Sequence, residues 1–460
     1  MSLSESPLTA ATTLDVRLSE SNPSAMQLIF SRLRRIAGGR EVWALADQAV
    51  VSGTNFITNI VLARTLGIRG FGVFALAWMA VLFLNSLQSS VIVTPMMSVA
   101  PKTSEQNRPS YFGATVVHQL GFGALCGLAI YFAAFVSSVY FHDQTIRRLA
   151  FPLSVAAFAY LSQDFFRRYL FVTGQTGRAF ANDVLSYLPQ VLGLILLAWL
   201  GHLTTAGAFW IIALTSCFGI VAGMLWLERI TIKTSAIRAV ASQHWKLSRW
   251  LAPSAVMEWM SNNLFVAVSP IYFGAMVAGI LRASSNIVGG AHIWFLGLDN
   301  VVPVEASRTL HREGIDAMLR YIKRILLRWG AVTALFVLIV GVAPSFWLHL
   351  LYGPQYAAYG YLLRIYGLLY LLVFLGGPLR AALQALEFTK PIFWSYTIMT
   401  VFSFIFAAPF SKWFGVQGVI FGSIATQIIY QSILTGSLIA KVRHIKRQVT
   451  KDRAELLVDR

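Results

Sequence analysis

One arginine stands alone in a long apolar stretch of this chain. Arg282 is the only charged residue between Glu258 and Asp299. A guanidinium does not lose its proton in a protein, and it is costly at membrane depth. Its planar fork suits a phosphate or carboxylate group, which it can bind through paired hydrogen bonds. The position of Arg282 therefore predicts an anion-binding site within a membrane protein.

Two carboxylates, Asp47 and Glu258, also lie in apolar surroundings. Each is within about a turn or two of the predicted cytoplasmic end of its helix. A carboxylate in such a place can bind a cation such as H⁺ or Na⁺, and this is the role that we predict for both. A solvated position at the end of the helix is the alternative.

Hydroxyl and amide side chains recur at helical spacing in three apolar segments. At 100° per residue they form polar stripes on otherwise apolar helices, and one stripe contains Arg282. We expect these stripes to face a polar cavity, although hydrogen bonding between neighbouring helices is the alternative for any single residue. The members of the stripes that we predict to bind substrate are Thr54, Asn55, Ser261, Asn262 and Asn286.

The surrounding sequence is that of a membrane protein. Of its 460 residues 57% are hydrophobic and 12% are charged, with a mean hydropathy of +0.64, whereas a soluble chain is roughly a quarter charged. Apolar runs of about 20 residues, the length that spans a bilayer, occur about twelve times. The predicted spans are 44–63, 71–94, 111–140, 151–171, 184–200, 206–227, 250–271, 275–298, 330–350, 361–383, 392–410 and 416–440.

Lysine and arginine alternate with these spans. With a cytoplasmic N-terminus, 29 of the 37 basic residues fall in segments on the inner side and five on the outer side. The positive-inside rule therefore predicts that both termini are cytoplasmic. The net charge of +18 is a signal of membrane topology, and no nucleic acid partner is expected.

The sequence contains no motif that indicates catalysis. We find no phosphate-binding loop, no His-Glu-x-x-His and no paired Asp-x-Asp, and both cysteines, Cys126 and Cys217, fall in apolar spans. We therefore expect no enzyme activity, no catalytic residue, no metal site and no cofactor. A membrane glycosyl polymerase or ligase is disfavoured because the predicted outer loops are short.

An internal repeat predicts the architecture. A shift of 207 residues aligns Gly67 with Gly274 and Gly72 with Gly279, and a shift of 213 aligns Arg167 with Arg380. Six spans separate equivalent helices, so the halves have the same orientation in the membrane. We predict an all-α polytopic fold of two six-helix lobes related by pseudo-two-fold symmetry, with a cavity between them. The predicted divisions are a cytoplasmic tail (1–40), an N-lobe (41–235), a C-lobe (236–440) and a basic cytoplasmic tail (441–460).

Residues 47–67, 70–77 and 350–357 resemble bacterial polysaccharide flippases of the Wzx type, in the multidrug/oligosaccharidyl-lipid/polysaccharide exporter superfamily. The resemblance implies an alternating-access carrier in the bacterial inner membrane, and for such a carrier we predict that Asp47 and Glu258 couple transport to a gradient of H⁺ or Na⁺. Its substrate would be an undecaprenyl-diphosphate-linked oligosaccharide repeat unit, used for O-antigen, exopolysaccharide or capsule. Membrane lipids and a polysaccharide polymerase machinery are the implied partners.

A second likeness is to the lipid II flippases of the same superfamily. Ala63-Arg64-Thr-Leu-Gly67 and Ile280-Leu-Arg282 are similar to segments whose arginines hold a diphosphate in that family. The resemblance implies that Arg64 and Arg282 bind substrate here. We expect twelve spans here, without the extra pair of C-terminal helices that forms a lipid groove in that family, so the path of the prenyl tail is not predicted. The alternative function is a cation-coupled drug or metabolite antiporter of the superfamily, with a cavity rich in carboxylates.

Overall fold

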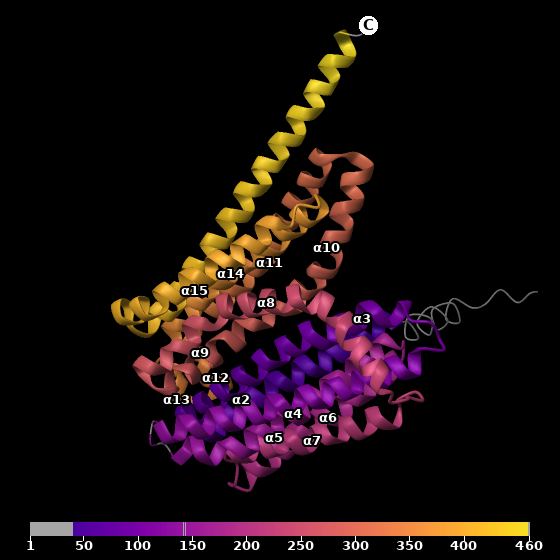
Figure 1. Ribbon diagram of the computed structural model, residues 1–460. Coiled ribbons are helices and arrows are strands. Elements are labelled where there is room, and N and C mark those ends of the chain that lie inside the picture. Colours follow the sequence, from indigo (N-terminus) through magenta and orange to yellow (C-terminus); the bar gives the residue numbers. More distant parts are fainter. Residues whose placement is uncertain (1–39, 141, 143, 459–460) are drawn as a thin grey trace, which may run out of the picture.

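The computed structural model describes residues 40–140, 142 and 144–458, so the predicted tail at 1–40 lies outside the described residues except for Arg40. All regular structure in this part is helical (Figure 1). The elements are α2 (Arg40–Gln88), η1 (Ser89–Val93), α3 (Thr94–Val99), η2 (Ala100–Lys102), α4 (Arg108–Tyr140), α5 (Gln144–Val172), α6 (Thr176–Trp199), α7 (Thr205–Leu225), α8 (Thr234–Phe273), α9 (Ala275–Val288), η3 (Gly289–Ala291), α10 (His292–Glu313), α11 (Ile315–Val342), α12 (Pro344–Tyr352), α13 (Pro354–Ala357), α14 (Gly360–Ala385) and α15 (Lys390–Val458).

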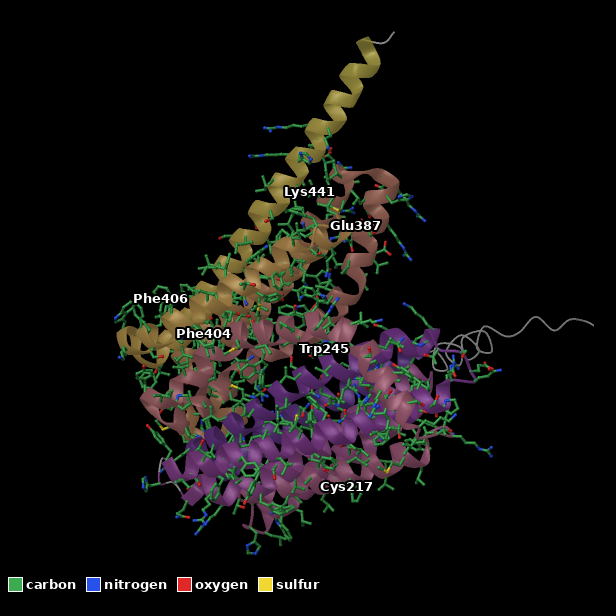
Figure 2. All side chains as sticks on the ribbon, viewed as in Figure 1. Cys217, Trp245, Glu387, Phe404, Phe406 and Lys441 are labelled. Atoms are coloured by element: carbon green, nitrogen blue, oxygen red, sulfur yellow. The ribbon has the colours of Figure 1, made fainter. Side chains whose placement is uncertain are left out.

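Within the described residues, nine segments are long and apolar enough to cross a membrane. Two of them contain two arms each, because α2 breaks at Gly67 and α15 breaks at Gly415. The helix α8 has spanning length but carries polar residues in its middle. The predicted fold class, an all-α polytopic membrane protein of about twelve helices, is confirmed. Large apolar side chains such as Phe404, which is 59% exposed, cover the outer surfaces (Figure 2).

The helices form two halves that meet along α2 and α9 (Figure 1). The glycines aligned by the repeat lie at this contact. Gly67 and Gly274 have nearly the same left-handed backbone, with φ of 68° and 71°. A Cβ atom on Gly72 would lie 1.9 Å from the carbonyl oxygen of Ala275, and one on Gly279 would lie 2.9 Å from the Gly72 nitrogen. The two halves therefore touch backbone to backbone, at positions that the repeat makes equivalent.

The helix α8 contacts both halves. Near its start, His244 Nε2 is 2.9 Å from the hydroxyl of Tyr111 on α4, and Ser248 Oγ donates to the carbonyl of Val91 at 3.1 Å. Burial, with a smaller effect of His118, lowers the pKa of His244 to about 4, so the ring is neutral at neutral pH. Further along, α8 packs against α15. The predicted boundary at 235/236 falls at the start of this bridging helix, and the lobe limits stay predictions.

Two segments predicted as cytoplasmic loops are helical instead. Residues 299–329 form the end of α10 and the start of α11, which are joined at Gly314 with φ of 84°. The first turns of α8 occupy the other predicted loop. A helix satisfies its own backbone hydrogen bonds, so it can extend beyond the apolar layer, where its basic side chains are hydrated.

The two ends of the bundle differ in character. One end, which we call the α12 end, holds Gly67, Gly274 and the short helices α12 and α13, and it is the end predicted to face outward. The other, which we call the basic end, holds the α10–α11 turn and the emerging part of α15. There Lys446 Nζ lies 2.5 Å from Asp316 Oδ1, which ties α15 to α11. This end is predicted to be cytoplasmic.

The backbone contact at Gly72 gives a first prediction. Replacing Gly72 by alanine places a methyl group against the Ala275 carbonyl, so we expect destabilisation of about 1–3 kcal/mol from overpacking. The matched control is Gly53→Ala on the same helix, where a Cβ meets nothing within 4 Å. That change is expected to be neutral or stabilising by about 0.4–1 kcal/mol. Thermal unfolding in detergent measures both, and equal melting temperatures for the two variants would contradict the contact.

Candidate functional site

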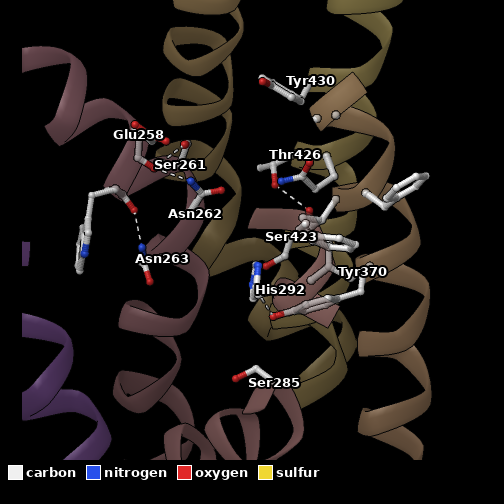
Figure 3. A pocket seen from close by; sticks show the side chains of 18 of the residues that line it. Glu258, Ser261, Asn262, Asn263, Ser285, His292, Tyr370, Ser423, Thr426 and Tyr430 are labelled. Carbon is white, nitrogen blue, oxygen red and sulfur yellow. Dashed lines mark hydrogen bonds between the residues drawn. The ribbon is translucent and has the colours of Figure 1, made fainter. Parts of the chain in front are cut away.

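A cavity of about 550 Å³ lies between the halves, and most of the residues that line it belong to the C-terminal half. Its walls come from α8, α9, α10, α14 and α15, while α2 contributes an apolar patch that includes Trp78 and Met79. Side chains of α8 and α15 approach the cavity from opposite sides (Figure 3). The cavity therefore depends on helices that the sequence places far apart, and on the packing of α9 against α2.

Arg282 lines this cavity from α9. Among the described residues, no carboxylate lies within 4.0 Å of its guanidinium. The titratable side chains that act on it electrostatically are three tyrosines, Tyr370, Tyr352 and Tyr366. Arg282 is thus a fixed positive charge in the cavity with no internal counter-ion in the described structure. Such a group is suited to bind an anion.

The other charges of the cavity are arranged differently. Arg380 of α14 pairs with Asp299 of α10, with Nη2 2.9 Å from Oδ1. Glu258 of α8 is exposed to the cavity, and its Oε1 accepts a long hydrogen bond of 3.5 Å from the Tyr396 hydroxyl. The Arg380–Asp299 pair is neutral overall, so Arg282 and Glu258 are the charges left for a ligand.

The remaining walls combine amides, hydroxyls and aromatic rings. Asn262 and Asn263 project from α8, and each donates to a backbone carbonyl of its own helix. Tyr370 and His292 form a hydrogen bond across α14 and α10 at 3.3 Å (Figure 3). Further polar or aromatic lining residues are Trp259, Ser423, Thr426, Gln427 and Tyr430. A wall of this kind can bind hydroxyl groups by hydrogen bonds and the faces of sugar rings by contact with aromatic rings.

The structure brings together four of the predicted site residues in this cavity: Arg282, Glu258, Ser261 and Asn262. Ser261 is buried and its hydroxyl donates to the Glu258 carbonyl at 2.8 Å. The sites predicted on the first helix do not join them. Thr54 is 9% exposed and donates to the carbonyl of Val50 at 2.6 Å. Asn55 is not among the cavity-lining residues either.

Two further predicted residues lie near the cavity but outside its lining. Arg64 is exposed at the α12 end, where its Nε donates to the carbonyl of Leu351 at 2.8 Å and its Nη2 donates to that of Leu350. Asn286 lies on α9 beside Tyr352, close enough to its hydroxyl for a hydrogen bond between the two side chains. The binding roles predicted for Arg64 and Asn286 stay predictions.

Asp47 lies in a different site, inside the N-terminal half. It is 1% exposed, and its Oδ2 lies 2.5 Å from Nη2 of Arg167 on α5. The same guanidinium has its Nε 2.6 Å from Asp183 Oδ2 and its Nη1 3.6 Å from Asp164 Oδ1. Three carboxylates therefore surround one arginine. The burial of Asp47 shows that the alternative predicted for it, a solvated position at the end of the helix, is wrong.

Sequence reasoning missed this acidic cluster and much of the cavity. The repeat aligns Arg167 with Arg380 but does not predict the aspartate partners of either. The presence of Asp164 inside a predicted apolar span is itself a signal of a buried partner. The pairing of Arg380 with Asp299 depends on the approach of α10 to α14, which no local pattern encodes.

Comparisons with known proteins identify the fold. No protein-family model matches the sequence, and no curated protein is significantly similar to it. Among solved structures, the chain resembles the inward-facing conformation of a multidrug resistance MATE family transporter of the MOP superfamily, with a TM-score of 0.69 and 13% identity over 86% of this chain and 96% of that one. It also resembles lipid II flippase MurJ in an inward closed conformation, with a TM-score of 0.65 and 13% identity over 86% and 87%.

The outward-facing conformation of a MATE family transporter is less similar in shape. It matches with a TM-score of 0.56 and 13% identity over 88% of this chain and 95% of that one. The fold is therefore that of the MOP superfamily transporters.

The acidic cluster gives a second prediction. Replacing Arg167 by methionine leaves three carboxylates without their main counter-ion, so we expect a loss of about 3–5 kcal/mol of stability. Adding Asp183→Asn should restore part of it, because it removes one of the unpaired charges. Expression level and thermal unfolding in detergent measure both effects.

The neighbouring residue offers the control. Arg168 is 39% exposed and its Nε reaches Asp164 only at 3.5 Å. Arg168→Gln is expected to cost no more than about 1 kcal/mol. A melting temperature for Arg167→Met equal to that of Arg168→Gln would show that the cluster does not stabilise the fold.

Proposed function

We propose that this protein is a flippase that moves undecaprenyl-diphosphate-linked oligosaccharide repeat units across the bacterial inner membrane. The observation that carries the proposal is Arg282, a guanidinium without a carboxylate partner in a cavity lined by amides, hydroxyls and aromatic rings. A diphosphate supplies the missing negative charge and accepts paired hydrogen bonds. The headgroup sugars supply hydroxyl groups for residues such as Asn262 and Thr426.

The energetics of such a reaction fit a carrier. Flipping breaks no covalent bond, and the obstacle is the cost of removing water from a charged, hydroxyl-rich headgroup. A polar cavity within the bundle lowers that cost, while the prenyl tail remains in lipid. Alternating access to this cavity from the two sides would complete the transfer, and the polysaccharide polymerase machinery would receive the product on the outer side. The cytoplasmic position of both termini is part of the same proposal.

Ion coupling is assigned to the two carboxylates, Asp47 and Glu258. Asp47 has an oxygen, Oδ1, that is buried and has no hydrogen-bond partner in the described structure, and its side chain also lies close to Asp183. Three carboxylates around the single guanidinium of Arg167 leave an excess of negative charge, which a bound cation or proton would reduce. Glu258 faces the cavity, where a cation or proton has direct access. Binding of H⁺ or Na⁺ at these groups would bias the carrier toward one of its conformations.

The second candidate function is a cation-coupled drug or metabolite antiporter. The observation that favours it is Glu258, which has no arginine or lysine partner in the described structure and shares the cavity with Trp259 and Tyr430. An organic cation could bind between the carboxylate and these rings. In that case Glu258, and not Arg282, would be the residue on which binding depends.

The proposal is tested by deleting the gene and measuring lipid-linked repeat units on the inner leaflet. We expect accumulation, which wild-type protein clears and Arg282→Ala does not. Loss of the charge-assisted hydrogen bonds should slow clearance about tenfold or more, and Arg282→Lys should retain part of the activity.

The control is Arg364→Ala, which removes another arginine from within a helix. Arg364 donates to the Gly341 carbonyl at 2.9 Å and does not line the cavity. We expect nearly normal clearance. If deletion of the gene causes no accumulation of repeat units, the proposed flippase function is wrong. If Arg282→Ala and Arg364→Ala impair clearance equally, the proposed role of Arg282 is wrong.

Coupling is tested in vesicles with an imposed H⁺ or Na⁺ gradient. Wild-type transport is expected to follow one of the two gradients, whereas Asp47→Asn combined with Glu258→Gln should transport at a rate that neither gradient changes. Each single variant shows which carboxylate is required. A gradient response in the double variant equal to that of the wild type would exclude both carboxylates.

A further inference from the structure

At the α12 end, an arginine of one half binds two backbone carbonyls of the other. Arg64 of α2 donates to the carbonyls of Leu350 and Leu351. Both lie in the last turn of α12, where helix carbonyls lack partners within the helix and carry partial negative charge. A guanidinium is well matched to this helix terminus. We call this contact the Arg64–α12 latch.

Other contacts close the same end. The rings of Phe71 on α2 and Tyr352 on α12 are stacked with centroids 6.5 Å apart. Gln355 of α13 approaches Gly67, with its Oε1 3.5 Å from where a Cβ would lie. The backbone contact at Gly72 lies one turn further along α2. The latch is thus the charged part of a closed seam between the halves.

A buried polar cluster lies directly behind the latch. Tyr352 and Tyr356 are both 0% exposed, and the Tyr356 hydroxyl has no hydrogen-bond partner in the described structure. Asn286 lies beside the Tyr352 hydroxyl, close enough for the two side chains to form a hydrogen bond with each other. A buried polar group without a partner destabilises the conformation that buries it. The Tyr356 hydroxyl is therefore unfavourable in this conformation, and binding of a ligand to the cluster in another conformation would explain its presence.

The cluster is connected to the cavity through Arg282. The Arg282 guanidinium is close enough to Tyr352 for the two to interact electrostatically. Arg282 also lines the cavity. Burial raises the pKa of Tyr352 to about 12, so its hydroxyl is a hydrogen-bond donor at neutral pH. Arg282, Asn286 and Tyr352 can all donate hydrogen bonds. Three donors, one of them charged, suit an anion.

We propose that Arg282, Asn286 and Tyr352 form a second, outer subsite for the anionic part of the cargo, and that the Arg64–α12 latch seals it in the present conformation. Opening the latch exposes the subsite on the α12 side, so Arg282 remains in contact with the anion while access changes from the cavity to the opposite end. The anion class, a phosphate or diphosphate, rests on the proposed flippase function. The latch itself does not, because it is defined by contacts between the halves.

The experiment measures access to the subsite from outside. Tyr356→Cys, at the member of the cluster that lies outside the three-donor subsite, is introduced with Cys126→Ala and Cys217→Ala, and intact spheroplasts are treated with a membrane-impermeant maleimide. Labelling is expected to be slow with Arg64 present and at least about tenfold faster with Arg64→Gln, as expected for loss of a charge-assisted hydrogen bond. Arg64→Lys keeps the positive charge but lacks the planar, forked guanidinium, so it should give a smaller increase in the labelling rate.

The matched control is Arg69→Gln, which removes another exposed arginine five residues further along α2. Its labelling rate should equal that of the parent. If Arg64→Gln is not recovered as folded protein, Arg64→Lys decides the question. Unchanged labelling in the Arg64 variant, or an equal rise in Arg69→Gln, would overturn the latch.

The ligand class is tested on the opened variant with inorganic pyrophosphate. We expect it to slow labelling at position 356 in Arg64→Gln at least about twofold, and to lose this effect when Arg282→Gln is added, because the charged donors are then gone. Absence of protection overturns the anion subsite, and protection that persists without Arg282 does the same. Neither result depends on transport of a lipid-linked cargo, so failure of the proposed function is seen separately.

Discussion

The arrangement of this protein depends on a simple electrostatic constraint: a charge within an apolar helical bundle is costly unless an opposite charge lies beside it. The chain satisfies this constraint at Arg167, which is surrounded by Asp47, Asp164 and Asp183, and again at Arg380, which is paired with Asp299. These pairs join helices that are distant in sequence, and removing one partner would leave an uncompensated charge. Arg282 departs from the rule in the described structure. Because Arg167 and Arg380 have carboxylate partners and Arg282 does not, this departure supports the proposal that Arg282 binds an anionic ligand.

The internal repeat explains the scaffold but not the site. Equivalent glycines give both halves the same left-handed break and let them touch at Gly72 and Gly279. The aligned arginines, Arg167 and Arg380, both bind aspartate. At the position equivalent to Arg282, however, the first half has Ala75, which lines the apolar patch of the cavity. Symmetry therefore builds the bundle, and a single departure from symmetry places the charge in one half.

The sequence predicted what depends on local pattern. Apolar length gave the spans, glycine spacing gave the repeat, and helical periodicity placed Ser261, Asn262 and Glu258 on the cavity wall with Arg282. The sequence did not predict which face of the first helix packs against other helices and which face is open to a ligand. Thr54 and Asp47 share a polar stripe there, but both are buried, and nearby Thr58 accepts a hydrogen bond from Gln190 of α6 at 3.3 Å. A polar stripe shows that a helix face has polar partners, and whether those are a ligand or another helix depends on tertiary packing.

The same limit explains Arg64. Its sequence context resembles that of a substrate-binding arginine, and in the structure its donors are occupied by the carbonyls of Leu350 and Leu351. A helix C-terminus and a phosphate both present oxygen atoms with negative charge, and a guanidinium can bind either of them. In a carrier that changes conformation, the two need not be exclusive. Closure at the α12 end would use the donors of Arg64 for the helix terminus, and opening would free them at the edge of the cluster formed by Asn286 and Tyr352. An anion reaching that edge would then compete with α12 for the same donors, which would favour the open conformation only while cargo is present.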